Sequence, residues 1–399
     1  MSTENLNVPV SLLRVAPLAA GSAATGTSGY SVSGVLPALS QHLGIEPAAA
    51  GQLVTLFALA CATSGPLMVA LTRAWPKRRI AVVALLITGA GNAFTAMAPS
   101  LALLVTARII TAVGVAVYVP AASATAAAIT TGSRRARAVA AVIGGLTVAL
   151  LLGVPITTAL LSRLGGYQGV FLLVMAACLL AAAAIVVVVP TAATASTVAS
   201  TLHQRPPASD GRVLCLLGAT FMATTGTFAV YTYITLVVQE STMHDWPASV
   251  MLAAYGLGAV AGNVISGRLT DRWGAAWLLL IATGTSCLAL LALTAAAASP
   301  VGLVGVLMVW GGACWAVYVP ANVLLLSNKD NKQGSTLLSL NASSVYAGMA
   351  TGGLVGGVVI EAAGVGTVPL VAAAAAVIAA GLAYLGAVRR REPSRMPKP

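Results

Sequence analysis

Charged residues are scarce in this chain of 399 residues, where they make up 8% of the total. Soluble proteins carry about 25%, so the composition excludes an ordinary water-soluble protein. Acids are scarcer than bases, with 9 Asp and Glu against 21 Lys and Arg, and no acid lies between Glu46 and Asp210. Hydrophobic residues make up 58%, and the mean hydropathy is +0.94. This balance is typical of a protein that lies within a membrane.

Residues that carry catalysis or bind metals are also few. His42, His203 and His244 fall in predicted loops, without the spacing of a nucleophile–base pair or a metal site. The five cysteines fall within apolar segments, and we expect them to act as small packing residues. Gly256–Gly258 has no strand before it, so it is not a dinucleotide fingerprint. No phosphate-binding loop is present, so we expect no cofactor, no metal and no direct use of ATP.

Long apolar blocks recur along the whole chain. Val170–Val189, for example, contains no polar side chain except Cys178. About 20 such residues cross the hydrocarbon core as a helix. We therefore predict an all-α membrane protein of twelve transmembrane helices, with spans near residues 12–36, 48–71, 80–98, 100–125, 138–161, 168–189, 213–239, 248–267, 276–298, 301–326, 336–360 and 366–387.

The basic residues are distributed unevenly between the predicted loops. If the N-terminus is inside, the outer loops hold only Arg163, Arg108 lies within a span, and all other Lys and Arg are in inner loops and tails. This asymmetry predicts that both termini lie in the cytoplasm, with the protein in the bacterial inner membrane. The net charge of +12 then reflects topology, and we expect membrane lipids as partners and no nucleic acid.

Two short segments recur at one displacement in the chain. Ala116–Ala121 is repeated as Ala316–Ala321, and Thr25–Thr27 is repeated as Thr225–Thr227. Both segments recur in the same order and 200 residues later in the chain. We therefore interpret the chain as two related, pseudo-symmetric halves. The predicted parts are an N-terminal six-helix bundle over 1–190, a cytoplasmic linker over 191–212, a C-terminal six-helix bundle over 213–388 and a basic cytoplasmic tail over 389–399.

Corresponding inner loops of the two halves carry a similar pattern. The second copy, Gly267–Gly274, reads Gly-Arg-Leu-Thr-Asp-Arg-Trp-Gly, and the first copy runs from Gly65 to Arg79. Together with the tandem repeat, these loops resemble the major facilitator superfamily. The most similar branch is that of the twelve-span bacterial drug and sugar efflux proteins, which includes chloramphenicol-resistance and purine-efflux exporters.

The resemblance implies a secondary transporter that exports a small amphipathic or polar organic compound by alternating access. It would be no enzyme, and we expect a monomer, with protons as a candidate coupling ion. An uptake symporter or a passive facilitator is the alternative within transport. A membrane-embedded enzyme or receptor is the alternative of another class, although the chain lacks a catalytic constellation for it.

In the family, the inner loops latch the two halves together. The resemblance assigns this role to Gly65, Arg73, Arg78, Gly267, Asp271 and Arg272. The first copy has Arg73 where the family has an acid. Only the second copy keeps this acid, as Asp271. The alternative is that these residues are ordinary positive-inside anchors and a loop charge.

Arg108 is the one strong charge well inside a predicted span, roughly 10 Å deep at ~1.5 Å per residue. A charge at the centre of a helix costs about 2.5–3.5 kcal/mol, so such residues usually face a polar interior. It is similar to an arginine typical of the family's fourth span. Related exporters carry an acid in the first span, but here Gly29 stands in its place and the usual proton carrier is absent.

The fifth span contains Gly153 and Pro155, followed by Thr157 and Thr158. This is similar to the exporter branch's glycine and proline motif, with threonines replacing its last glycines. Pro155 lacks a backbone donor and favours a bend, while glycines allow close helix approach. The resemblance implies a hinge, and simple packing is the alternative.

Polar and aromatic residues concentrate in predicted spans 1, 4, 7, 10 and 11. In the family, spans 1, 4, 7 and 10 line the central cavity, and tyrosines suit amphipathic solutes because they join an apolar face to a polar tip. The residues implied as the substrate cavity are Tyr30, Arg108, Tyr118, Tyr231, Tyr233, Trp315, Tyr318, Asn322 and Asn341. We also expect Pro120 and Pro320 to bend spans 4 and 10 alike.

Overall fold

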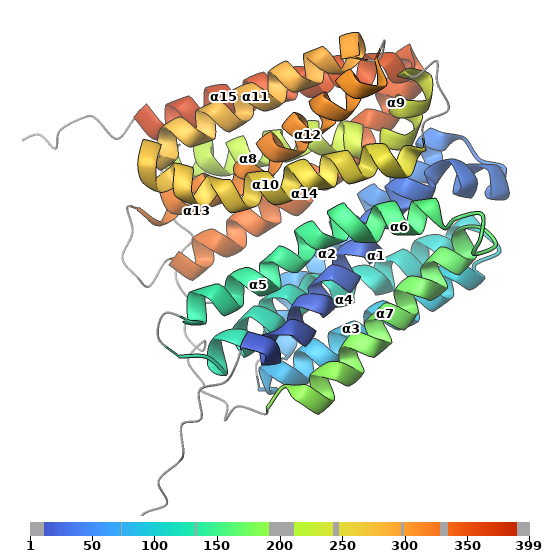
Figure 1. Cartoon of the computed structure of the whole chain (residues 1–399), viewed down its shortest axis with the longest axis vertical. Helices are drawn as coiled ribbons and strands as arrows, with labels where there is room; N and C mark the ends of the chain where they lie inside the picture. The colour runs from blue at the N-terminus through green and yellow to red at the C-terminus, as the bar shows by residue number, and fades with distance from the viewer. Residues whose placement is uncertain are drawn as a thin grey trace, which may run out of the picture. The chain divides into compact units, whose positions relative to one another are not determined.

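The computed structural model describes residues 12–72, 74–131, 134–190, 211–241, 247–296, 299–327 and 334–388. Arg73, the basic tail over 389–399 and nearly all of the predicted linker lie outside these ranges. Every described element is helical (Figure 1). In order they are η1 (Leu12–Val15), α1 (Ala16–Leu43), α2 (Pro47–Leu71), α3 (Lys77–Met97), α4 (Leu101–Ala128), α5 (Arg134–Val148), η2 (Ala149–Gly153), α6 (Val154–Ala159), α7 (Tyr167–Val188), α8 (Gly211–Tyr231), α9 (Ile234–Ser241), α10 (Ala248–Trp273), α11 (Ala275–Ala296), α12 (Pro300–Ala316), α13 (Tyr318–Leu326), α14 (Gly334–Ala363), η3 (Val365–Thr367) and α15 (Val368–Val388).

Each predicted span coincides with one helix or with consecutive helices, so the all-α fold class is confirmed. In the described part of the chain, eleven helical segments are long and apolar enough to cross a membrane. The remaining predicted span is α1, which is 28 residues long but rich in Ser, Thr and Gly. Its polar residues are buried against neighbouring helices, which explains why hydropathy alone underrates it.

The chain divides into two compact units. Unit 1 comprises Met1–Gly44 with Ala60–Thr197, and unit 2 comprises Ile45–Leu59 with Val198–Pro399. The first half of α2 therefore groups with unit 2, whereas the sequence-based division placed it in the N-terminal bundle. The reason is local packing: the Tyr233 hydroxyl donates to Ala48 O at 3.3 Å. Apart from this segment, the chain passes from unit 1 to unit 2 between Thr197 and Val198, within the predicted linker.

Small residues bring the helices of unit 1 close together. A Cβ on Gly145 of α5 would lie 2.3 Å from Ala19 O of α1, and one on Gly114 of α4 would lie 2.5 Å from Ala84 O of α3. Such spacing is impossible for larger residues, so van der Waals contact between backbones holds the bundle together. The buried core includes Leu18, Leu85, Tyr118, Val142, Val174 and Ile185.

In unit 2, glycines likewise bring α10 and α12 into close backbone contact. A Cβ on Gly258 would lie 1.9 Å from Met308 O, and one on Gly262 would lie 2.1 Å from Gly312 O. Helix α14 approaches α8 in the same way, since a Cβ on Gly352 would lie 2.5 Å from Thr225 O. Close backbone contact therefore fixes the helices on which the polar residues of unit 2 lie.

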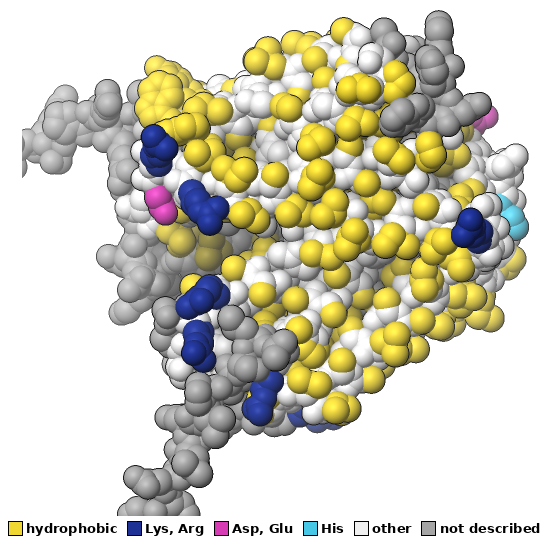
Figure 2. Space-filling view, in the orientation of Figure 1, with side chains coloured by type: hydrophobic (Ala, Val, Ile, Leu, Met, Phe, Trp, Pro, Cys, Tyr) yellow, Lys and Arg dark blue, Asp and Glu magenta, His cyan; other side chains and the backbone are white. Residues whose placement is uncertain are grey.

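The surfaces of the helices are apolar along their length. Exposed large hydrophobic side chains include Leu180, Val187, Leu288, Val301 and Val377. Figure 2 shows hydrophobic side chains over the helix faces of both units, with most of the visible basic side chains at one end of the helices and one basic group at the other. This pattern fits helices whose sides face lipid and whose ends face water.

Candidate substrate site

Arg108 lies two turns from the N-terminal end of α4 and is completely buried. Its Nη1 donates to the main-chain oxygen of Ser28 in α1 at 3.0 Å. Its guanidinium carbon lies 5.8 Å from the ring centroid of Phe171 in α7, within cation–π range. Residues of α1, α4 and α7 therefore surround this cation.

Ser28 also links α1 to α3. The Ser28 hydroxyl and the Asn92 side chain are hydrogen-bonded in both directions, with Ser28 Oγ to Asn92 Oδ1 at 3.0 Å and Asn92 Nδ2 to Ser28 Oγ at 2.9 Å. Asn92 is fully buried and donates as well to Thr88 O at 2.8 Å. Arg108, Ser28 and Asn92 thus form one buried polar cluster across α4, α1 and α3. Gly29 lies beside it, and the described part of unit 1 contains no carboxylate.

The glycine and proline motif of the fifth span lies at a helix irregularity. Helix α5 continues into the π-helical turn η2, in which the Val154 N–H donates to Ala149 O. Helix α6 follows, with Pro155 in its first turn. The wider π turn accommodates a residue that cannot donate to the helix. Gly153 faces α1, where a Cβ would lie 1.9 Å from Thr27 Oγ1.

The two other predicted cavity residues of unit 1 lie on α4 and α1. Tyr118 is completely buried ten residues after Arg108 in α4, and its hydroxyl donates to Leu18 O at 2.8 Å. It therefore joins α4 to α1 within the core. Tyr30 is half-buried in α1, two residues beyond Ser28.

In unit 2, the rings of α8, α10 and α12 form a buried aromatic cluster. The Tyr231 and Tyr255 centroids are 5.0 Å apart, and those of Tyr255 and Trp310 are 4.8 Å apart. Phe228 extends the cluster at 5.8 Å from Tyr231. These rings offer a rigid apolar wall with polar atoms at its edges.

The remaining predicted residues of unit 2 form two pairs. Trp315 and Tyr318 stack edge to face at 5.5 Å. Asn341 of α14 donates to Asn322 Oδ1 of α13 at 2.9 Å. Tyr318 also hydrogen-bonds Thr224 of α8. The structure thus gathers Trp315, Tyr318 and Asn322 on consecutive turns around the junction between α12 and α13.

Tyr233 lies at the interruption between α8 and α9 and is completely buried. Its hydroxyl donates to Gly353 O at 3.0 Å and to Ala48 O at 3.3 Å. Gly51, Gly356 and Gly357 all lie so near its ring that a Cβ on any of them would approach within 3 Å. The side chain therefore anchors the interrupted segment to α2 and α14.

The predicted latch residues occupy the ends of helices. Arg78 donates from Nε to Ile185 O at 3.4 Å and from Nη2 to Val186 O, so it caps the C-terminal end of α7. Asp271 and Arg272 are exposed in the last turn of α10. Gly267 has open space around its Cα, and Gly65 is half-buried in α2. The position of Arg73 lies outside the described residues.

Several residues of these clusters were missed in the sequence. Phe171, Asn92 and Tyr255 lie on α7, α3 and α10, outside the spans predicted to line the cavity, and Trp310 lies on α12, within predicted span 10. A polar or aromatic residue inside an apolar segment is the signal that could have found Asn92 and Tyr255. Nothing local distinguishes Phe171 from an ordinary packing residue.

Comparison with known proteins gives one consistent result. Residues 18–329 and 216–399 match the model of the Major Facilitator Superfamily. An uncharacterised MFS-type transporter of Bacillus subtilis (strain 168) is 31% identical over 89% of this chain and 90% of its own length. A chloramphenicol resistance protein of Streptomyces lividans is 31% identical over 75% and 77%.

A solved structure of similar fold is that of a bacterial homologue of the human lysosomal transporter Spinster, in an inward-facing and unoccupied conformation. Its TM-score is 0.73 at 16% identity, and the match covers 96% of this chain and 98% of that one. At this identity the likeness concerns the fold alone.

Proposed function

Since the chain belongs to the major facilitator superfamily and is a multi-pass membrane transporter, we propose that it exports a small amphipathic organic compound by alternating access. The observation that carries the proposal is Arg108, a fully buried cation that donates a hydrogen bond to a backbone oxygen of α1. A buried charge within a span is costly, so it is usually retained for function.

The charge of this cluster favours one class of substrate. Unit 1 has no carboxylate among its described residues, so Arg108 would attract electron-rich groups and repel organic cations. The Phe171 ring, 5.8 Å from the Arg108 guanidinium carbon in the same unit, would pack against apolar parts of a solute. We therefore infer a neutral or anionic amphipathic substrate. The chloramphenicol resistance protein among its relatives supports this class.

Contact between Arg108 and substrate requires a conformational change, because the side chain is covered in this structure. Helix α1 covers it and is rich in glycine, so α1 is the element that we expect to move. We propose a location in the cytoplasmic membrane with both termini inside, as the distribution of basic residues indicates. A proton remains a candidate coupling ion, although no acid occupies the position of Gly29.

Uptake into everted membrane vesicles tests the proposal. Labelled chloramphenicol and an organic cation would be compared in vesicles with and without the chain, each with a proton gradient imposed or collapsed. We expect gradient-dependent accumulation of the neutral compound and none of the cation. Accumulation of the cation alone would contradict the substrate class. Accumulation only in right-side-out vesicles would favour the uptake alternative.

A further inference from the structure

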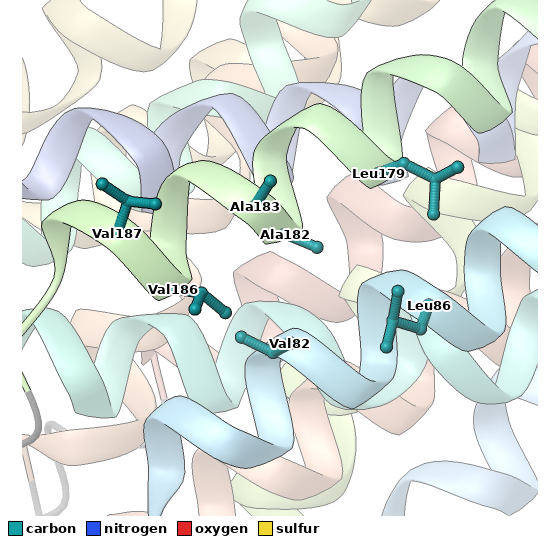
Figure 3. Close-up of a pocket in the computed structure, with 7 residues that line it drawn as sticks. All are labelled: Val82, Leu86, Leu179, Ala182, Ala183, Val186 and Val187. Atoms are coloured by element: carbon teal, nitrogen blue, oxygen red, sulfur yellow. The ribbon is translucent and has the colours of Figure 1, made fainter.

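An apolar groove runs along the outside of unit 1 between α3 and α7 (Figure 3). It has a volume of about 360 Å³ and is lined only by apolar residues, among them Val82 and Leu86 of α3 and Leu179, Ala183 and Val186 of α7. Figure 3 shows Ala182 and Ala183 between the larger side chains, so small residues create the depression. The groove follows the helices instead of entering the bundle.

One end of the groove carries positive charge. Arg78 donates to Val186 O, and Val186 is itself a lining residue, so a guanidinium lies at this end. Arg78 and Arg79 are one helical turn before Val82, on the same side of α3. Lys77 begins the helix. The apolar groove therefore continues into the cations Arg78 and Arg79, with Lys77 preceding them at the start of α3.

The surroundings of these cations carry no negative charge from the described residues of their own unit. The described residues of unit 1 include no Asp or Glu, and Arg79 instead lies over the Trp75 ring at 4.8 Å. A second copy that packed with the same face against this one would bring no Asp or Glu from the described residues of unit 1. An anion attached to an apolar chain matches both parts of the groove.

We propose that this groove binds an anionic phospholipid, with an acyl chain between α3 and α7 and its phosphate at Lys77, Arg78 and Arg79. The acyl chain covers Leu86 and Leu179, which are 46% and 42% exposed. The phosphate neutralises the N-terminal end of α3, where anions are favoured by the helix dipole. The bound lipid thus holds α3 against α7.

The test compares two lipids that share their acyl chains. The purified full chain in a neutral detergent is supplied with phosphatidylglycerol or phosphatidylcholine, and its thermal unfolding and its retained lipid, by native mass spectrometry, are measured. We expect phosphatidylglycerol to raise the unfolding midpoint more than phosphatidylcholine, by about 2–4 °C. Equal shifts for the two lipids would overturn the proposal.

Two variants divide the site into its parts. Ala183→Phe fills the groove and should reduce the additional shift by more than half, together with the retained phosphatidylglycerol. The double variant Lys77→Gln with Arg79→Gln should show equal midpoint shifts with phosphatidylglycerol and phosphatidylcholine, because the groove still accepts an acyl chain but no longer favours the anionic headgroup. Arg78 is left intact because it caps α7. If Ala183→Phe does not fold, Val187→Trp replaces it, since Val187 is 82% exposed.

Matched controls carry the same changes elsewhere. Ala374→Phe lies on an exposed face of α15, and Arg163→Gln removes a cation beyond the opposite end of the bundle. Both should keep the wild-type preference for phosphatidylglycerol. An unchanged preference in Ala183→Phe would overturn the proposal. So would a change of oligomeric state in that variant without any lipid effect, because the groove would then hold a second copy.

Discussion

Arg108 in α4 is joined to Ser28 in α1 by a 3.0 Å hydrogen bond from its Nη1 to the main-chain oxygen. A backbone dipole thus meets the buried cation at the place where related exporters are expected to carry an acid. Gly29 occupies that place and has no side chain to contribute. We propose that this buried cation attracts an electron-rich group of the substrate when α1 moves.

Replacing Arg108 by lysine should damage transport nearly as much as replacing it by alanine. Lysine keeps the charge but loses the planar fork that reaches Ser28 O while lying against Phe171. An interaction of a charged group worth about 1.5–3 kcal/mol, if it is lost from the rate-limiting state of transport, corresponds to roughly a tenfold or larger loss of rate. Initial rates in vesicles, normalised to protein amount, measure this.

The control for Arg108 is Arg163→Lys, at an exposed position beyond α6, which should transport as the wild type does. Size-exclusion chromatography in detergent shows whether each variant folds. Two well-folded and fully active Arg108 variants would reduce this residue to a structural role.

Gly145→Ala should lower the thermal stability of the protein, whereas the adjacent Gly144→Ala should not. A Cβ on Gly145 would lie 2.3 Å from the backbone oxygen of Ala19, but nothing lies within 4 Å of one on Gly144. Overpacking costs about 1–3 kcal/mol, while alanine improves helix propensity by up to ~1 kcal/mol. Thermal unfolding in detergent should therefore separate the two variants, and equal midpoints would contradict the close approach of α1 and α5.

Tyr233→Phe distinguishes an anchoring role from a substrate contact. The hydroxyl is bonded to Gly353 O and Ala48 O, so its loss should lower stability by about 1–3 kcal/mol. The KM for substrate should change less than twofold, since the hydroxyl is already occupied. Tyr384→Phe, at an exposed position on α15, is the matched control. A raised KM with unchanged stability would instead favour the cavity role inferred from the sequence.

The spans could be predicted because their signal is local. Apolar length, loop charge and the tandem repeat all depend on residues near one another in the chain, and the helices follow them closely. The depth of Arg108 followed in the same way from its distance to the end of the span. What the guanidinium would contact could not be predicted, because Ser28 and Phe171 lie far from it in the sequence.

Identical local sequence can also give different helices. Pro120 lies inside the continuous helix α4, whereas the same hexapeptide around Pro320 lies where α12 ends and α13 begins. The expected equal bends are therefore not found, and the cause must lie in the neighbours. Tyr118 bonds Leu18 O of α1, while Tyr318 bonds a threonine side chain of α8. Likewise, the interruption before α9 contains neither Gly nor Pro.

Cysteine labelling tests the proposed orientation. In a Cys-free background, Thr131→Cys should react only with reagent on the cytoplasmic side, and Ser100→Cys only with reagent outside. Both positions are exposed at opposite ends of α4. A membrane-impermeant maleimide applied to intact cells and to everted vesicles provides the measurement. The opposite pattern would reverse the orientation, and equal labelling from both sides would contradict α4 as a span.

Asp271→Asn should reduce the transport rate without lowering the thermal stability of the protein. Asp271 lies in the C-terminal turn of α10, where a negative charge opposes the helix dipole by about 0.3–1 kcal/mol. Removing it should leave thermal stability unchanged or slightly raised. If the residue holds an inner latch, transport should nevertheless fall, because the state closed at the cytoplasmic side loses a charge pair. Arg272→Gln removes the adjacent charge at the same helix end and tests the pairing. A transport rate equal to that of the wild type in Asp271→Asn would show that the acid is only a loop charge.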